Sequence, residues 1–318
     1  MQAWEVSNNR LALHDVEPPT AGPGETVLDV ALAGVCGSDI PKLRHPAAFD
    51  LPPVWRPGHE IVASEPVRGM MAVDPLISCG ECRPCSVGDT HLCPSLVRVG
   101  WDRLGGYAAQ ICVPDINIHP IHDLHWKIAV LADPMAVAVH GLRCSRIDTA
   151  EHIAVIGAGA IGFLTAAYAR SLGSKVTMIT RHAPRMVLDG VRMASASEAS
   201  AHSFDVVVDA ASGASAEPLE LALALVRAGG TVIAQNAYHP GITMTTALRD
   251  IFRRSLRIIG SFSFCQREGS DFAIGLDVLR RTPEAIELID TTSPLEHLAQ
   301  LIDPDSPSAP IRHVLAIA

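Results

Sequence analysis

Apolar runs of strand length alternate with helix-like stretches through the middle of the chain. The segment HIAVIGAGAIGFLTAAYARSLGSKVTMITRH begins with a β-type run at 153–156 and then turns through several glycines. A stretch with few helix breakers follows, and a second β-type run occupies 175–179. Two short apolar runs that flank a helical pattern are typical of a βαβ unit. The pattern therefore predicts a parallel strand pair with a crossover helix.

The same alternation continues toward the C-terminus. Further strand-like runs are FDVVVDA, GGTVIAQN and LRIIGSF, and they are separated by helix-like stretches such as Glu217–Arg227. Repeated βα alternation predicts an α/β, doubly wound parallel sheet. The most apolar runs contain glycines at turn positions and are interrupted by charge, so we interpret them as buried strand–helix units and not as membrane spans.

Composition and charge narrow the class of protein. A length of 318 residues corresponds to about two domains at roughly 150 residues each. With 48% hydrophobic and 19% charged residues and a mean hydropathy of +0.24, the chain can form sizeable cores. The net charge of −9 and the pI near 5.8 argue against nucleic acid or an anionic membrane as partner. The first residues show no signal-peptide pattern, so we expect a cytoplasmic, reducing location.

The glycines of the βαβ segment follow the dinucleotide-binding spacing. Gly157-x-Gly159-x-x-Gly162 lies between the predicted strand and helix, and Ile161 belongs to the same turn. In this context the first glycine permits a tight turn, the second lets backbone N–H groups approach a pyrophosphate, and the third allows the helix to pack on the strand. The segment therefore predicts a nicotinamide dinucleotide site, against a glycine-rich turn without ligand.

The end of the second predicted strand bears on cofactor choice. A fold selective for NAD places Asp or Glu there, to hydrogen-bond the ribose hydroxyls. This chain has Thr180-Arg181-His182, with Arg185 shortly after. Guanidinium groups match a 2′-phosphate, whereas ordinary surface charges are the alternative. We therefore expect NADP(H) in preference to NAD(H).

Four cysteines are concentrated in one short stretch. Their spacing is Cys79-x2-Cys82-x2-Cys85-x7-Cys93. Thiolates at such spacing can converge on one ion and form a closed tetrahedral zinc site, which stabilises a loop but leaves no position for substrate. A bacterial iron–sulfur run would need its fourth cysteine at Asp89, and disulfides would need an oxidising compartment. The stretch predicts a structural zinc.

A second constellation is distributed over three segments. Cys36 lies in GVCGSD, His59 and Glu60 lie in RPGHE, and Asp133 precedes a proline at the start of a helix-like run. Taken singly, these residues are more typical of a buried thiol, a solvated turn and a helix cap. Together, a thiolate, an imidazole and a carboxylate can form a three-ligand catalytic zinc site with an open position.

These motifs, with LGGYAAQICVP at 104–114, resemble the zinc-containing medium-chain alcohol dehydrogenase family in order and spacing over nearly the whole chain. The resemblance implies a mainly β, GroES-like catalytic domain interrupted by a Rossmann domain. It suggests a catalytic part at 1–134 with the zinc lobe at 79–93, a nucleotide part at 135–262, and a C-terminal return at 263–318.

The resemblance also implies a set of ligands. Cys36 and His59 resemble the catalytic zinc ligands, and Glu60 resembles a glutamate that ligates the metal or lies behind it. Asp133 occupies the third-ligand position, where simple alcohol dehydrogenases have Cys and the polyol, sugar and threonine branches have Glu. This carboxylate favours a polyhydroxylated substrate, and its shorter side chain leaves direct ligation or a bridging water open.

Two further roles are implied. Ser38 resembles the hydroxyl that binds the substrate oxygen and takes its proton, and Arg312 resembles an arginine near the cofactor phosphates and the glutamate. Pro41 stands where a proton-relay histidine is common, so the relay runs through water or through His45.

The combined expectation is a zinc-dependent NADP(H) oxidoreductase with two zinc ions per chain, interconverting a secondary alcohol and a ketone on a polyol, sugar or aminocyclitol. The alternatives are a dehydrogenase of simple secondary alcohols, a non-catalytic NADPH sensor with structural zinc only, and a zinc-independent reductase, which would lack Cys36. Family members are homodimers or homotetramers, and 257–262 is the expected contact.

Overall fold

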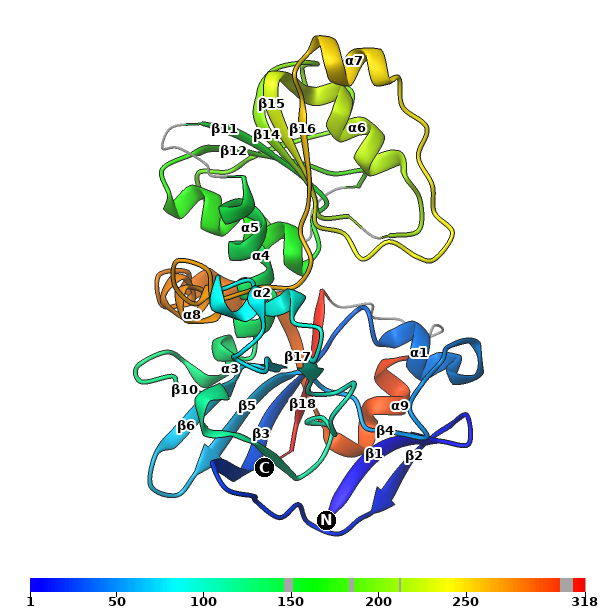
Figure 1. Ribbon diagram of the computed structural model, residues 1–318, viewed down its shortest axis with the longest axis vertical. Helices are drawn as coiled ribbons and strands as arrows, with labels where there is room; N and C mark the ends of the chain where they lie inside the picture. Colours follow the sequence, from blue (N-terminus) through cyan, green and yellow to red (C-terminus); the bar gives the residue numbers. More distant parts are fainter. Residues whose placement is uncertain (146–150, 183–185, 212, 304–310, 318) are drawn as a thin grey trace. The chain divides into compact units, whose positions relative to one another are not determined.

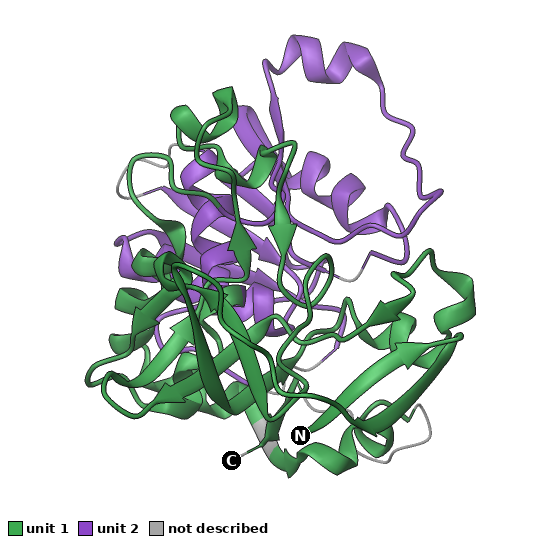
Figure 2. Ribbon diagram, turned by 60° about the horizontal axis from the view of Figure 1, so that its bottom comes forward, with its two compact units in different colours: residues 1–133, 265–318 green, residues 134–264 purple. Residues whose placement is uncertain are grey.

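The computed structural model describes residues 1–145, 151–182, 186–211, 213–303 and 311–317. The chain divides into two compact units, which Figure 2 shows in different colours. Unit 1 comprises Met1–Asp133 and Cys265–Ala318, and unit 2 comprises Pro134–Phe264. Unit 1 is therefore discontinuous in sequence, with unit 2 inserted between its two parts.

Over the described residues, unit 2 contains a sheet of six parallel strands in the order β13-β12-β11-β14-β15-β16 (Figure 1). The strands are β11 His152–Ile156, β12 Lys175–Ile179, β13 Arg192–Ala194, β14 Phe204–Asp209, β15 Val226–Ala234 and β16 Arg257–Gly260. From β11 the chain winds in one direction to β12 and β13, and from β14 in the other direction to β15 and β16. The predicted doubly wound parallel sheet is confirmed, and its strand order reverses beside β11, where such sheets bind nucleotides.

Helices cover both faces of this sheet. Helix α5 (Ala160–Ser171) packs on β11 and β12, whereas α6 (Glu217–Leu225) packs on β14 and β15. Right-handed crossovers that run in opposite directions along a sheet place their helices on opposite faces, as Figure 1 shows for α5 and α6. The remaining helices of this part are α4 Ala132–Cys144, whose first two residues belong to unit 1, and α7 Leu248–Arg253.

Helix α6 ends earlier than its apolar pattern predicts. The helix expected over Glu217–Arg227 ends at Leu225, and Val226 has an extended backbone with φ −65° and ψ 137°. Val226 is fully buried and pairs with Phe204 as the first residue of β15. A β-branched side chain fits a buried strand better than a helix end, and the sheet therefore takes this residue.

The glycine-rich turn between β11 and α5 requires residues without a side chain. Gly157 has φ +112°, and its N–H donates to the carbonyl of Ile179 at 2.9 Å. A Cβ on Gly162 would lie 2.1 Å from the carbonyl oxygen of Gly157. Neither position can accept a larger residue without displacing backbone, so the tight turn directs the start of α5 to the carboxyl end of the sheet.

Unit 1 is built on β-strands. Its larger sheet, over the described residues, has the order β10-β6-β5-β3-β18-β17, with β9 also paired to β3; β2-β1-β4 and β7-β8 form smaller sheets. The strands are β1 Gln2–Ser7, β2 Arg10–Asp15, β3 Glu25–Val35, β4 Val54–Trp55, β5 Glu60–Glu65, β6 Gly69–Val73, β7 Leu76–Ile77, β8 Val97–Arg98, β9 Gln110–Pro114, β10 Ile118–Pro120, β17 Ile289–Pro294 and β18 Arg312–Ala316. Strand β18, drawn in red in Figure 1, lies antiparallel to β3. The C-terminal segment therefore completes the sheet that the N-terminal part begins.

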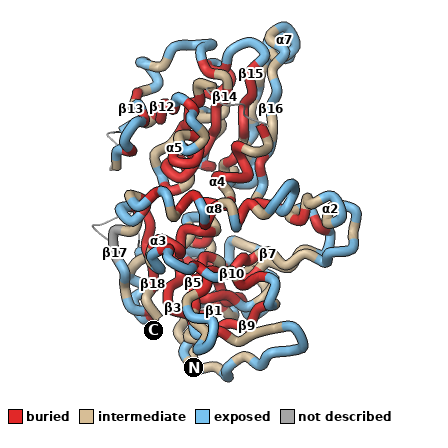
Figure 3. Tube along the Cα trace, turned by 90° about the vertical axis from the view of Figure 1, so that its left-hand side faces the viewer, coloured by how far each residue is buried: buried red, intermediate tan, exposed pale blue. Residues whose placement is uncertain are grey.

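Short helices surround this sheet, and its core is apolar. The helices are α1 Ile40–Arg44, α2 Arg83–Ser86, α3 Trp126–Ala129, α8 Asp271–Arg280 and α9 Leu298–Leu301. The core includes Leu28, Trp55 and Tyr107, each at most 1% exposed, and Figure 3 shows the buried positions following the central strands. In the part of the chain that the structure describes, no helix is both long and apolar enough to cross a bilayer.

Candidate functional site

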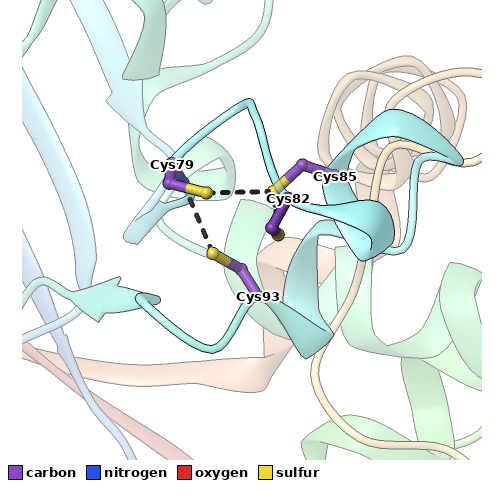
Figure 4. Close-up of side chains that lie close together, drawn as sticks. All are labelled: Cys79, Cys82, Cys85 and Cys93. Carbon is purple, nitrogen blue, oxygen red and sulfur yellow. Dashed lines mark hydrogen bonds between the residues drawn. The ribbon is translucent and has the colours of Figure 1, made fainter.

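The four clustered cysteines converge in one lobe of unit 1 (Figure 4). Their sulfur atoms all lie within 4.8 Å of one another. The Cys82 and Cys85 sulfurs are 3.3 Å apart, and the N–H of Cys79 donates to the sulfur of Cys93 at 3.4 Å. Helix α2 carries Cys85 one turn from Cys82, and a 3-10 turn at Thr90–Leu92 returns the chain so that Cys93 faces the others.

This lobe fits a tetrahedral zinc ion. All eight cysteines of the chain lie in described residues and are free thiols, so the cluster is not a pair of disulfides. Backbone N–H groups of Glu81 and Cys82 lower the pKa of the Cys79 thiol to about 6. A thiolate is the form that binds zinc. Four sulfur ligands close the coordination sphere, so the lobe has a structural role and supplies no open position for a substrate.

The lobe contacts the segment by which the chain re-enters unit 1. The N–H of Gln266 donates to the carbonyl of Gly88 at 3.0 Å, and Arg267 Nε donates to Asp89 Oδ1 at 2.6 Å. A Cβ on Gly88 would lie 2.6 Å from the Cα of Arg267, so the two backbones are in close contact. A metal ion that holds the lobe therefore also supports the start of the C-terminal return.

The second constellation is assembled by the pairing of β3 with β5. Cys36 directly follows β3, His59 precedes β5, and the antiparallel register places Glu60 opposite Gly34. One ligand atom each from Cys36, His59 and Glu60 lies within 4.8 Å of the others. Gly58 makes the turn before them with φ +101°, and a Cβ there would lie 2.5 Å from the ring of Tyr107. The motif GHE thus needs its glycine for a steric reason.

Glu60 is a buried carboxylate with Arg312 as its near cationic neighbour and the His59 ring 4.0 Å from the same oxygen. It is 1% exposed, and its Oε1 lies 2.7 Å from Nη2 of Arg312, a residue of β18 that is itself buried. Burial raises the pKa of Glu60 to about 8, and the charge of Arg312 opposes this rise. Neither oxygen of Glu60, nor Oδ2 of Asp39, has an aligned hydrogen-bond partner among the described residues. Buried carboxylate oxygens in this state are suited to a cation.

Cys36 is held in a form that can bind metal. Burial alone raises the pKa of its thiol, but the neighbouring charges of His59 and Arg312 lower it to about 6. Ser38 Oγ lies 3.2 Å from the sulfur, so the hydroxyl is beside the atom that would hold the metal. The chain's own groups thus offer a thiolate, an imidazole and a carboxylate next to a hydroxyl, a donor set that fits zinc.

Asp133 lies in the first turn of α4 and is half-buried. Within the described residues, the donor group with mutual distances under 4.8 Å contains Glu60 and not Asp133. Burial raises the pKa of Asp133 to about 7, while the charge of His59 lowers it and that of Glu60 raises it further. Asp133 is therefore an electrostatic neighbour of the cluster, and its ligation of a metal stays a prediction.

Asp39 is a site residue for which the sequence suggested no role. Its Oδ2 lies 3.4 Å from Nδ1 of His59, and the residue is 3% exposed. A carboxylate on one ring nitrogen of a histidine sets the tautomer and directs the other nitrogen toward a metal. The only feature of the sequence that could have indicated a role for Asp39 is its position directly after Ser38 in the motif GVCGSD.

Replacing Asp39 by Asn is expected to lower zinc affinity at this site, and turnover with it, by about 10- to 100-fold, because the partner that orients His59 loses its charge. Competition of the loaded protein with a metal chelator measures the change. Asp50→Asn, at an exposed position, is the matched control. Equal zinc retention in both variants would contradict a role for Asp39.

Of the residues predicted to bind the cofactor, Arg312 lies in β18 of unit 1, and the others that the structure describes lie at the carboxyl end of the sheet in unit 2. The turn from Gly157 to Gly162 includes Gly159 as the N-cap of α5 and Ile161 in its first turn. Thr180, Arg181 and His182 directly follow β12, and Thr180 Oγ1 donates to the carbonyl of His182 at 2.7 Å. Arg185 lies outside the described residues.

Comparison with known families and proteins agrees with this architecture. Residues 22–123 match the family described as Alcohol dehydrogenase GroES-like domain, and residues 153–249 match Ketopantoate reductase PanE/ApbA. D-altritol 5-dehydrogenase of Agrobacterium fabrum (strain C58) is 30% identical over 319 residues, covering 93% of this chain and 89% of that protein.

Two further similarities are informative. L-galactonate-5-dehydrogenase of Escherichia coli (strain K12) is 31% identical over 173 residues, covering 51% of this chain and 50% of that protein. A crystal structure from Sinorhizobium meliloti 1021, designated a zinc-binding dehydrogenase and bound to NADP, superposes with a TM-score of 0.86 at 27% identity, covering 99% of this chain and 98% of that chain.

Proposed function

The chain belongs to the zinc-containing medium-chain alcohol dehydrogenase family, and from this premise we propose that it interconverts a secondary alcohol and a ketone on a polyol or sugar acid, with NADP(H) as cofactor. The observation that carries the proposal is the cluster of Cys36, His59 and Glu60, with Ser38 Oγ 3.2 Å from the Cys36 sulfur. A non-catalytic sensor has no need for such a donor set beside a hydroxyl.

Each side chain of the cluster has a distinct task. Bound zinc supplies a Lewis acid for the alcohol oxygen, and bound nicotinamide supplies the hydride acceptor. Cys36 and His59 would hold the metal, and the Ser38 hydroxyl would accept the proton of the substrate alcohol while passing its own proton to water. Asp39 orients His59, and Arg312 keeps the Glu60 carboxylate beside the metal position, whether Glu60 or Asp133 provides the third ligand.

Ser38 needs a route by which the proton leaves. Pro41 has no titratable side chain, and His45 is exposed at the end of α1, where its N–H donates to the carbonyl of Pro41. A water chain from the Ser38 hydroxyl is the route we favour, because within the described residues no hydrogen bond or ion pair joins His45 to Ser38.

A polyhydroxylated substrate is favoured by the carboxylates around the metal position and by the relatives. D-altritol 5-dehydrogenase and L-galactonate-5-dehydrogenase are named for a polyol and a sugar acid. Asp133 in the third-ligand position, where the polyol and sugar branches of the family have Glu, favours the same substrate class over a simple aliphatic alcohol.

The preference for NADP(H) rests on the residues after β12. Thr180, Arg181 and His182 include no carboxylate for the ribose hydroxyls, and Arg181 is exposed with a guanidinium available for a 2′-phosphate. On the neighbouring turn, Glu198 accepts hydrogen bonds from the N–H and hydroxyl of Ser195.

We further propose a homodimer or homotetramer in the cytoplasm. Strand β16 is at the edge of the described sheet of unit 2; Ile258 within it and Phe262 shortly after it are 41% and 58% exposed. An edge strand with apolar side chains is suited to pairing with a second copy. Free thiols at all eight cysteines fit a reducing compartment.

Initial rates test the proposed function. Zinc-loaded protein is assayed with NADP⁺ and NAD⁺ against alditols, aldonates, aminocyclitols and 2-butanol. We expect a polyhydroxylated substrate to exceed 2-butanol in kcat/KM by about tenfold or more, since buried polar groups left unpaired by a simple alcohol cost binding. NADP⁺ should exceed NAD⁺, and Arg181→Ser should remove that preference.

The alternatives make different predictions. A sensor would bind NADPH, contain one zinc per chain and turn over none of these compounds. A dehydrogenase of simple alcohols would turn over 2-butanol at least as well as the alditols. Faster turnover with NAD⁺ would overturn the role of Arg181 and leave the reaction type intact.

A further inference from the structure

Lys42 places a cation beside the catalytic centre in a way that no assigned role explains. It lies in α1, and its ammonium donates to the carbonyl oxygen of Ser38 at 2.7 Å. The side chain is 19% exposed and lies over the ring of Trp101, with Nζ 5.0 Å from the ring centroid. The residue that it contacts is the one whose hydroxyl is 3.2 Å from the Cys36 sulfur.

The charge of Lys42 is not neutralised by a hydrogen-bonded carboxylate among the described residues. Its nearest described anion is Asp39, whose Oδ1 is 3.9 Å away, beyond hydrogen-bond distance. The other oxygen of Asp39 faces Nδ1 of His59 at 3.4 Å, so this carboxylate is shared between Lys42 and His59. An ammonium has three N–H donors, and the Ser38 carbonyl uses one of them.

Arg98 provides a contrast on the same aromatic ring. Its guanidinium lies 5.4 Å from the centroid of Trp101, but it donates to both oxygens of Asp102, at 2.7 and 3.2 Å. Its charge is therefore paired, and it is 40% exposed. Of the two cations on Trp101, Lys42 is the one with donors left for a ligand.

The wall that carries Lys42 is rigid. Trp101 packs edge-on against Trp55, with ring centroids 5.6 Å apart, and Trp55 Nε1 donates to the carbonyl of Gly100 at 2.7 Å. Trp55 is 1% exposed, and Leu43, next to Lys42, is 3% exposed. The ring of Trp101 and the hydrogen bond to the Ser38 carbonyl limit the rotamers of the lysine, so its ammonium is pre-positioned at low entropic cost.

We propose that Lys42 binds a carboxylate of the substrate, so that the enzyme selects polyhydroxylated acids (aldonates) over the uncharged alditols. This inference rests on the proposed dehydrogenase function and narrows its substrate class. The carboxylate accepts the free N–H donors of Lys42 while a secondary hydroxyl further along the same short chain reaches Ser38 and the metal position. A charge-assisted hydrogen bond in a half-buried position is stronger than one to a neutral hydroxyl. Cationic aminocyclitols are correspondingly disfavoured.

Matched pairs of compounds test the proposal: L-galactonate with galactitol, and D-altronate with D-altritol. Both kcat/KM and the dissociation constant of the complex with zinc-loaded protein and reduced cofactor are measured. Wild type is expected to favour the acid, and Lys42→Met to reduce that preference by about 10- to 100-fold, as for a lost hydrogen bond to a charged group. The alditols should change by less than about threefold, because methionine keeps the packing on Trp101. Lys42→Arg should restore most of the preference for the acid.

Arg98→Met is the control, since it removes from the same ring a cation whose guanidinium is already hydrogen-bonded to both oxygens of Asp102. Raising the salt concentration should weaken binding of the acid to wild type and have little effect on Lys42→Met. Equal binding of acid and alditol by wild type would overturn the proposal. So would an equal loss of affinity for both compounds in Lys42→Met, or a loss of preference for the acid in Arg98→Met as large as that in Lys42→Met. If wild type turns over none of the four compounds, the dehydrogenase proposal fails for them, and the ratio of dissociation constants still decides the role of Lys42.

Discussion

Replacing Cys36 by Ser is expected to lower turnover by roughly a thousandfold or more. A metal acting as a Lewis acid contributes several kcal/mol to the barrier, and each 1.4 kcal/mol is about tenfold in rate. The thiol of Cys36 has its pKa lowered to about 6 by His59 and Arg312, against the effect of burial, whereas a serine hydroxyl stays protonated and binds zinc poorly. Initial rates and zinc analysis on the same preparation measure the effect, and zinc content should fall from two ions per chain to one.

Cys144→Ser is the matched control for this substitution. Cys144 lies at the end of α4, outside both cysteine-containing clusters described above, and its sulfur is 3.5 Å from Nε2 of His140. A serine can keep that contact, so activity and zinc content should stay near those of wild type. Retention of two zinc ions by Cys36→Ser would show that the catalytic metal does not depend on this thiol.

Replacing Arg312 by Leu is expected to destabilise the protein by about 3–5 kcal/mol, the usual cost of leaving one member of a buried ion pair without its partner. Arg312 and Glu60 have side chains 7% and 1% exposed, and their charged atoms are 2.7 Å apart. The substitution leaves the buried Glu60 carboxylate beside Cys36 and His59 without its arginine counter-charge. Urea unfolding of the zinc-loaded protein measures the free energy of unfolding.

Two variants control for other effects of this change. Arg68→Leu removes an ion pair with Asp115 in which both side chains are 47% exposed, and it should cost at most about 1 kcal/mol. Adding Glu60→Gln to Arg312→Leu should recover part of the lost stability, because the unpaired charge is removed. Similar losses in Arg312→Leu and Arg68→Leu would mean that the charge of Glu60 is compensated elsewhere, with the metal as the first candidate.

Features built from nearby residues were accessible from the sequence. Apolar periodicity and glycine spacing predict the run from β11 through α5 to β12, because the conformation of each of these elements depends on neighbours only a few residues away. The boundary between α6 and β15 was less accessible. Val226 continues the apolar helical pattern, but its pairing with Phe204 in the sheet determines its conformation.

The catalytic cluster needed more than local pattern. Short motifs and a family resemblance predicted a metal site at Cys36, His59 and Glu60. The proximity of these residues nevertheless depends on the antiparallel register of β3 and β5. A one-residue shift in that register would turn Glu60 to the opposite face of the sheet. Asp39 and Lys42 gave no separate signal, because an aspartate and a lysine near a turn are ordinary surface residues in most sequences.

The sequence by itself therefore determined the family, the doubly wound sheet of unit 2 and the four-cysteine lobe between Cys79 and Cys93, whose ligands are close in the chain and need only local geometry to meet. The tertiary structure alone decided that Asp39 faces His59 and that Lys42 lies on Trp101. The physical reason is that burial and ion pairing arise between segments far apart in sequence. Their free energies depend on packing and on the exclusion of water, which no local pattern records.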